Sequence, residues 1–92
     1  MSERLRVLIH GRVQGVGFRY STARKAQGLG LTGWVRNLCT GSVEALFEGP
    51  RNTLEEMLCW CKHGPMIAKV KETEVNWERG AAEHSSFEVR SG

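Results

Sequence analysis

A glycine-rich stretch at residues 11–19, GRVQGVGFR, separates a segment with strand periodicity from a segment with helix periodicity. Glycine adopts backbone conformations that other residues avoid, and it lets a ligand come close to the main chain. Successive N–H groups of such a loop can point inward around an anion, and Arg19 would add a fixed positive charge. Glycines between a strand and a helix are also common as simple turn formers. The stretch therefore predicts a tight strand–loop–helix junction and leaves open whether that loop binds a ligand.

The segments on either side of this loop have the periodicities of a strand and of a helix. Residues 5–13 alternate, with apolar or small side chains at the odd positions, which is typical of a half-buried strand. Residues 18–28 carry Thr22, Ala23 and Ala26 at helical spacing and end at a glycine, which predicts a helix. The N-terminal N–H groups and the dipole of this helix would add to the loop, so the junction favours a phosphate-like anion.

Two further strands and a second helix are expected in the middle of the chain. Residues 32–38 and 42–48 are rich in strand formers, and the three residues between them predict a short hairpin loop. After a Gly-Pro pair, Asn52 is expected to cap a helix, with Glu55 at the capping-box position. The buried stripe of this helix is predicted to contain Leu54, Met57, Leu58 and Cys61.

The last third of the chain predicts strand, interrupted by a bulge and a loop. Val70 and Val75 have opposite parity, so a bulge is expected within residues 71–74. A polar loop at residues 80–86 then precedes a short terminal strand at residues 87–89.

The order strand, helix, strand, strand, helix, strand predicts an α+β fold. The expected arrangement is a ferredoxin-like βαββαβ sandwich, with two helices on one face of a mostly antiparallel sheet of four to five strands. The first two strands would be parallel, with the third strand between them. The glycine-rich loop would then share a sheet edge with Arg36, Asn37 and Leu38, at a separation of roughly 10 Å. The fold thus predicts one site made from both segments.

Composition limits the classes of protein to consider. A length of 92 residues predicts a single domain, residues 1–92, and 13 basic against 10 acidic side chains give a formal charge of +3, which mildly favours anionic ligands. No stretch approaches the ~20 apolar residues of a membrane helix, and no targeting segment is evident. We therefore expect a cytoplasmic protein without membrane contact.

The three cysteines are interpreted as reduced, because a disulfide framework normally uses more of them. Cys59 and Cys61 would point about 200° apart around a helix and are not expected to bond to each other. Geometry leaves a bridge from Cys39 to either one undecided. Cys59 and His63 have the i, i+4 spacing of a metal pair, but without a second pair nearby we expect buried thiols, a C-terminal histidine and no metal.

With the loop and the sheet edge defined, the chain resembles the acylphosphatase family along essentially its whole length. Residues 11–19 resemble the first signature of that family, and residues 33–37 (GWVRN) with 41–45 (GSVEA) resemble the second. Thr40 stands where the family usually has Asp or Asn before the hairpin glycine. The resemblance implies a small enzyme that hydrolyses carboxyl-phosphate mixed anhydrides to a carboxylate and inorganic phosphate.

Arg19 and Asn37 match the catalytic pair of that family. Loop N–H groups and the Arg19 guanidinium are expected to hold the phosphoryl oxygens, and the Asn37 amide to orient the attacking water. The expected phosphate-binding residues are Gln14, Gly15, Val16, Gly17, Phe18 and Arg19. Because neither signature contains a suitably placed Asp, Glu or His, the substrate's own phosphate is expected to accept the proton, with no metal and no cofactor. Inorganic phosphate and other anions are the expected inhibitors.

Two other functions share some of these features. RNA-recognition domains have the same order of elements, but they stack bases on aromatic residues of two central strands, where this chain has only Phe47, so no nucleic-acid partner is expected. Acylphosphatase-like domains also occur at the front of larger carbamoyl-transfer enzymes that mature hydrogenases, which makes carbamoyl phosphate the alternative substrate. The sequence does not identify the physiological acyl group, and a monomer is expected because no exposed apolar face is evident.

Overall fold

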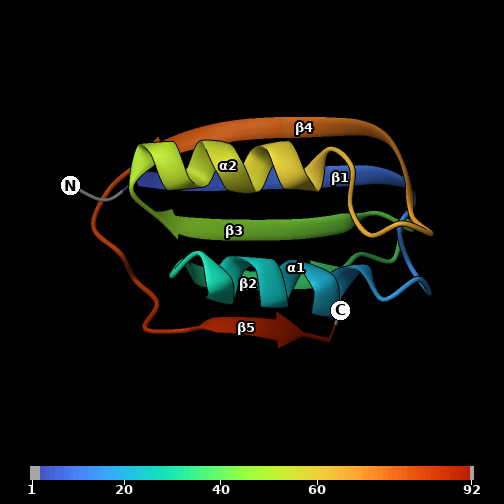
Figure 1. The fold of residues 1–92 in the computed structure, drawn as a ribbon, viewed down its shortest axis with the longest axis horizontal. Coiled ribbons are helices and arrows are strands. Elements are labelled where there is room, and N and C mark those ends of the chain that lie inside the picture. Colours follow the sequence, from blue (N-terminus) through green and yellow to red (C-terminus); the bar gives the residue numbers. More distant parts are fainter. Residues whose placement is uncertain (1–2, 92) are drawn as a thin grey trace.

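The computed structural model describes residues 3–91 of the chain. Five strands and two helices follow one another in this range (Figure 1). Their bounds are β1 (Glu3–Arg12), α1 (Phe18–Gly28), β2 (Thr32–Asn37), β3 (Val43–Gly49), α2 (Arg51–Cys61), β4 (Lys69–Arg79) and β5 (Phe87–Arg90). The order predicted from the sequence, including the short terminal strand, is confirmed.

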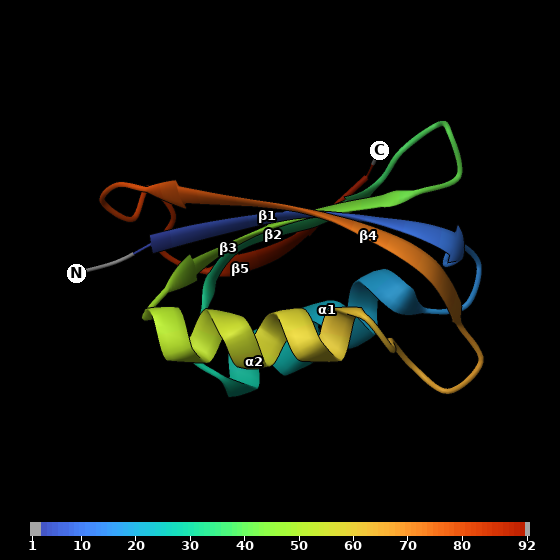
Figure 2. The same ribbon diagram turned by 90° about the horizontal axis from the view of Figure 1, so that it is seen from above.

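The strands form one sheet in the order β4-β1-β3-β2-β5. Strand β3 pairs antiparallel with both β1 and β2, so β1 and β2 run in the same direction on either side of it. Strand β4 lies antiparallel to β1 at one edge, and β5 lies parallel to β2 at the other. Both helices cover the same face of the sheet (Figure 2). This is the predicted ferredoxin-like α+β sandwich, with five strands.

The core lies between this face of the sheet and the helices. Leu5, Val7 and Ile9 of β1 are fully buried, because alternate side chains of a strand point to the same face. Phe47 of β3 stacks on Phe87 of β5 with ring centroids 5.4 Å apart. The helices add Phe18, Thr22, Ala23 and Ala26 from α1, and Leu54, Met57 and Cys61 from α2. This shared core fixes α1, and with it the end of the glycine-rich loop, against the sheet.

One irregularity interrupts the pairing of β4 with β1. His10 pairs with Glu72, whereas the next residue, Gly11, pairs with Val70, so Lys71 is the extra residue of a bulge. A bulge shifts the side-chain alternation by one position, which accounts for the opposite parity of the apolar residues before and after it. The bulge expected in this segment is therefore confirmed.

The start of α2 differs from the sequence prediction, and Asn52 is not its N-cap. The helix begins at Arg51, and Pro50 is the N-cap, with φ −66° and ψ 146° and no side-chain capping bond. The Pro50 carbonyl accepts the first helical hydrogen bond, from the Leu54 N–H at 3.0 Å. Because Pro50 already has the extended conformation of an N-cap, Asn52 falls inside the first turn. Glu55 accordingly accepts a bond from Arg51 at 3.3 Å and closes no capping box.

The three cysteines are free. Cys61 is buried in the core, whereas Cys59 and Cys39 are exposed, so the expectation of a buried thiol at Cys59 is wrong. Cys59 lies on the solvent side of α2, because the buried residues of that helix, Leu54, Met57 and Cys61, lie on another face. Burial raises the pKa of the Cys61 thiol far above its usual value, so that thiol stays protonated. His63 Nδ1 lies 3.0 Å from the Cys59 carbonyl, at the C-terminal end of α2.

Glu48 is a buried carboxylate that ties the β4–β5 loop to the sheet. Its residue is 2% exposed. It accepts hydrogen bonds from the N–H groups of Glu83 and His84 at 2.9 and 3.0 Å and from the Thr32 hydroxyl at 2.9 Å, and His84 Nδ1 lies 3.1 Å away. Burial by itself raises the pKa of Glu48, but these hydrogen bonds outweigh it and hold the pKa below its usual value. The alternation of residues 42–48 does not predict this burial, which arises because the β4–β5 loop covers the carboxylate at Glu83 and His84.

Replacing Glu48 by Gln is expected to lower the free energy of unfolding by about 2 kcal/mol at neutral pH, because an amide loses charge-assisted hydrogen bonds and adds buried donors. Because the folded-state pKa is lowered, the stabilisation is present above the ordinary glutamate pKa of about 4.3 and is lost as the pH falls through the folded-state value. The difference between wild type and Glu48→Gln in urea titrations should therefore shrink from pH 7 toward pH 3. Exposed Glu55→Gln is the control, and a Glu48→Gln difference that stays constant with pH would contradict this role.

Candidate active site

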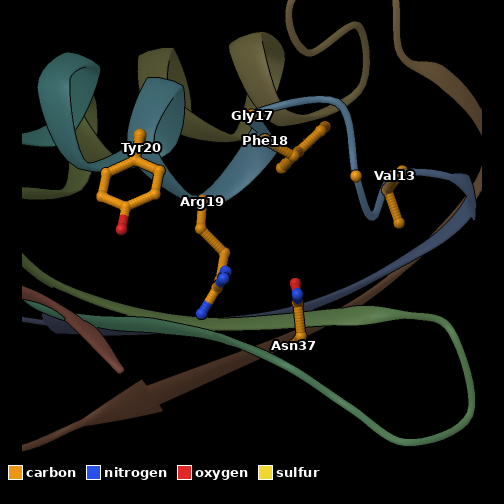
Figure 3. A pocket seen from close by; sticks show the side chains of 7 residues that line it. Val13, Gly17, Phe18, Arg19, Tyr20 and Asn37 are labelled. Atoms are coloured by element: carbon orange, nitrogen blue, oxygen red, sulfur yellow. The ribbon is translucent and has the colours of Figure 1, made fainter. Parts of the chain in front are cut away.

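A small pocket lies between the N-terminus of α1 and the end of β2 (Figure 3). Its volume is about 110 Å³, and its lining residues are Val13, Gly15, Gly17, Phe18, Arg19, Tyr20 and Asn37. Arg19 extends from α1 toward the sheet, and Asn37 rises from β2 into the same space (Figure 3). The structure thus brings the glycine-rich loop and the end of the second strand to one sheet edge, as the parallel arrangement of β1 and β2 predicts.

Two glycines give the loop its shape. Gly15 and Gly17 both have φ of 74°, in the left-handed region where a side chain is disfavoured. Gly17 is also the N-cap of α1, without a side-chain capping bond, and the first turn contains no acidic residue. The first helical backbone bond runs from the Ser21 N–H to the Gly17 carbonyl at 3.0 Å, so the N–H groups before Ser21 have no partner within the helix. This end of α1 presents donors and a positive dipole to the pocket.

Arg19 is held from two directions. Its backbone belongs to the first turn of α1, which the core fixes against the sheet. One terminal nitrogen of its side chain donates a hydrogen bond to the Arg90 carbonyl, at the end of β5, at 2.9 Å. The central guanidinium carbon also lies 6.0 Å from the ring centroid of Tyr20. A guanidinium has five N–H donors, so this single bond orients Arg19 and leaves most of its donors for an anion.

Asn37 is positioned by backbone pairing. It is the last residue of β2 and pairs with Val43, the first residue of β3. The hairpin beyond it is closed by a bond from the Leu38 N–H to the Ser42 carbonyl at 2.8 Å. The β2–β3 register therefore decides where the Asn37 amide stands relative to Arg19.

Gln14 connects the glycine-rich loop to this hairpin. Its side-chain Nε2 donates to the Leu38 carbonyl at 2.7 Å and to the Ser42 carbonyl at 2.9 Å. Both donors of the amide are thereby used inside the protein. These bonds tie the loop directly to the segment that follows Asn37, so the two halves of the pocket are held in a fixed position relative to each other.

Four of the six residues predicted to bind phosphate line the pocket, and two do not. Those that line the pocket are Gly15, Gly17, Phe18 and Arg19, whereas Gln14 and Val16 are absent from the lining. The Val16 side chain packs against the core, and that of Gln14 bonds to the hairpin. Contact of any of the six with phosphate stays a prediction.

Three contributors to the pocket were not predicted from the sequence. Val13 continues the alternation of β1 and is 1% exposed, which is the signal of a core residue. Tyr20 follows Arg19 in the first turn of α1, and the spacing of apolar residues in this segment does not indicate that Tyr20 lies at a pocket. Arg90 acts through its backbone carbonyl, which no side-chain pattern reveals.

The pocket lining contains no Asp, Glu or His. His10, whose strand leads into the loop, instead contacts Ser42 Oγ and Glu74 Oε2, each at 2.6 Å. Within residues 3–91 no group of three or more His, Cys, Asp or Glu residues is arranged to hold a metal ion. The chemistry of the pocket is therefore that of a fixed positive charge, backbone N–H donors and one amide side chain.

The fold and the pocket define a ferredoxin-like domain whose glycine-rich loop and arginine have the geometry of an anion site. The acylphosphatase family model matches residues 5–89. The acylphosphatase of Trichormus variabilis is 59% identical over 75 residues, which are 82% of this chain and 74% of that one. The crystal structure of acylphosphatase from Bacillus subtilis superposes with a TM-score of 0.92 at 39% identity, covering 96% of this chain and 98% of that chain. The chain belongs to the acylphosphatase family.

A larger protein contains a similar domain. The crystal structure of full-length HypF, in a phosphate- and nucleotide-bound form, matches with a TM-score of 0.84 at 25% identity, over 99% of this chain and 12% of that chain.

Neither helix in residues 3–91 is long and apolar enough to cross a membrane.

Replacing Gln14 by Leu is expected to lower the free energy of unfolding by about 2 kcal/mol, because the Leu38 and Ser42 carbonyls each lose a donor. Urea titration measures this loss, and amide exchange should become faster at Leu38 and Gly41, whose N–H groups close the hairpin that Gln14 ties to the loop. Gln27→Leu is the matched control, since Gln27 is exposed and donates one longer bond, 3.3 Å, to the Phe87 carbonyl. Wild-type stability and wild-type exchange in Gln14→Leu would show that the loop does not depend on this tie.

Proposed function

We propose that the protein hydrolyses acyl phosphates at this pocket, with Arg19 and Asn37 as its catalytic residues. The observation that carries the proposal is the convergence of the glycine-rich loop, Arg19 and Asn37 on one small space in a member of the acylphosphatase family. All of these residues come from one chain, which supports a monomer acting on a small substrate, and the cytoplasm is the location that we propose for it.

The phosphoryl group binds between the N-terminus of α1 and the Arg19 guanidinium. N–H groups of the loop and of the first turn of α1 donate to its oxygens, and the Arg19 guanidinium binds two of them with its planar fork. In phosphoryl transfer, charge develops on the equatorial oxygens of a loose transition state. Donors that are already oriented stabilise that charge without rearranging during the reaction. The bond from Arg19 to the Arg90 carbonyl supports this role, because it limits how the guanidinium can turn.

Asn37 orients the attacking water. Its amide oxygen accepts a hydrogen bond from the water, and the water oxygen attacks phosphorus on the side opposite the acyl oxygen. The bond between phosphorus and that oxygen breaks, and its electron pair leaves with the carboxylate. The products are a carboxylate and inorganic phosphate.

The proton of the attacking water passes to an oxygen of the phosphoryl group itself. A carboxylate is a good leaving group, so it needs no general acid, and the lining holds no Asp, Glu or His to act as a base. Arg19 and the loop N–H groups supply the charge stabilisation that Mg²⁺ supplies in many phosphoryl-transfer sites. The proposed reaction therefore uses neither metal nor cofactor.

Arg19→Ala and Asn37→Ala are each expected to lower kcat/KM for benzoyl phosphate by 100-fold or more, roughly the effect of removing one oriented donor from a transition state. Arg19→Lys should fail similarly, because a point charge does not reproduce the fork. Arg24→Ala is the matched control: Arg24 is an exposed arginine of α1 that is absent from the pocket lining. Near-normal turnover by either alanine variant, with a native far-UV spectrum, would refute the mechanism.

Inorganic phosphate is expected to inhibit competitively, and the wild-type rate is expected to be the same in EDTA as in buffer. Both results follow from a site that recognises the phosphoryl group through N–H donors and an arginine. The measurement is the initial rate of acyl phosphate hydrolysis at several phosphate concentrations, with and without chelator. Activity that disappears in chelator would mean that a metal ion supplies the charge.

Carbamoyl phosphate is the alternative substrate, which the resemblance to domains at the front of larger carbamoyl-transfer enzymes implies. Carbamoyl phosphate carries the same phosphoryl group on a smaller acyl part, so the loop and Arg19 would bind it in the same way. Comparison of kcat/KM for carbamoyl and benzoyl phosphate separates the two roles. A marked preference for carbamoyl phosphate would identify this protein as a specialised enzyme of that substrate.

A further inference from the structure

The pocket has room for a phosphoryl group and little else, so the acyl part of a substrate must lie outside it. Its volume is about 110 Å³, whereas pockets that enclose whole organic ligands usually measure roughly 300–1,000 Å³. Arg19, Asn37 and the loop N–H groups supply its polar contacts. Any selection among acyl groups therefore depends on the side chains at its rim.

Tyr20 is the aromatic side chain at this rim. It lines the pocket and is nevertheless 65% exposed. In Figure 3 its ring lies on the far side of Arg19 from Asn37. The other large hydrophobic residues that are exposed within residues 3–91 are Met66, Ile67 and Val75, and none of them belongs to the pocket lining. An exposed ring beside a phosphoryl-sized pocket gives the acyl group an apolar surface to contact.

The setting of Tyr20 leaves its ring available for such a contact. Its ring centroid lies 6.0 Å from the guanidinium carbon of Arg19, at the outer limit of a cation–π contact. A tyrosine has few rotatable bonds, so ordering the ring against a ligand costs little conformational entropy. Because Arg19 adjoins both the pocket and the ring, a phosphoryl group bound to Arg19 places its acyl substituent near Tyr20.

We propose that Tyr20 is a specificity-determining residue, and that its ring favours acyl phosphates with an aromatic acyl group over acyl phosphates as small as acetyl phosphate. This inference rests on the proposed function, because it assumes that the phosphoryl group occupies the pocket. Aromatic pairs in proteins have coupling energies equivalent to about a twofold to tenfold change in an equilibrium constant. The expected selectivity is of that size.

The test is the ratio of kcat/KM for benzoyl phosphate to kcat/KM for acetyl phosphate. Tyr20→Ala is expected to lower this ratio about twofold to tenfold, mainly through a higher KM for benzoyl phosphate, and Tyr20→Phe to preserve it. The inhibition constant of inorganic phosphate should stay at the wild-type value in Tyr20→Ala. Ile67→Ala is the control, since Ile67 is also 65% exposed and does not line the pocket.

Each outcome separates this inference from the function on which it rests. A wild-type enzyme that hydrolyses neither compound would refute the proposed function. If it hydrolyses both and Tyr20→Ala leaves the ratio unchanged, or if Ile67→Ala lowers it equally, the role of Tyr20 is refuted and the function stands. If Tyr20→Phe loses as much selectivity as Tyr20→Ala, the hydroxyl rather than the ring is responsible, and the proposed aromatic contact is refuted.

Discussion

The pairing of β3 with both β1 and β2 is the constraint on which the rest of the structure depends. Since each partner is antiparallel to β3, β1 and β2 are parallel and end at the same edge of the sheet. That edge receives the glycine-rich loop from one strand and Asn37 from the other. Gln14 then bonds across the gap to the hairpin that leaves β2, so the loop is held by side-chain donors as well as by chain connectivity.

Local sequence predicted the elements that periodicity and glycine define. Strand β1 alternates cleanly on its buried side, and α1 spans residues 18–28 as expected because its small residues recur at helical spacing and its ends are marked by glycines. The N-cap of α2 was missed because Pro50 and Asn52 both suit a helix start locally. Pro50 is the N-cap because its fixed φ of −66° suits the extended conformation of that position, and Asn52 therefore lies inside the first turn.

The candidate site was predictable in its charged and amide groups and unpredictable in what orients them. The parallel strands predict that the glycine-rich loop and residues 36–38 share one sheet edge, and the resemblance to the acylphosphatase family singles out Arg19 and Asn37 there. The acceptor for Arg19 is a backbone carbonyl 71 positions away, and two of the partners of Glu48, Glu83 and His84, lie in a loop 35 and 36 positions away. Contacts of this kind depend on how distant segments meet, so composition and spacing contain no signal for them.

The bond between Arg19 and β5 links the pocket to the least anchored strand of the sheet. Strand β5 has four residues and one neighbour, β2, because it lies at the sheet edge. Edge elements of this size open locally with a smaller free energy than the central strands need. When β5 separates from β2, the Arg90 carbonyl leaves with it, and the guanidinium regains its rotational freedom. Local opening of this one short strand would therefore release the Arg19 guanidinium without global unfolding.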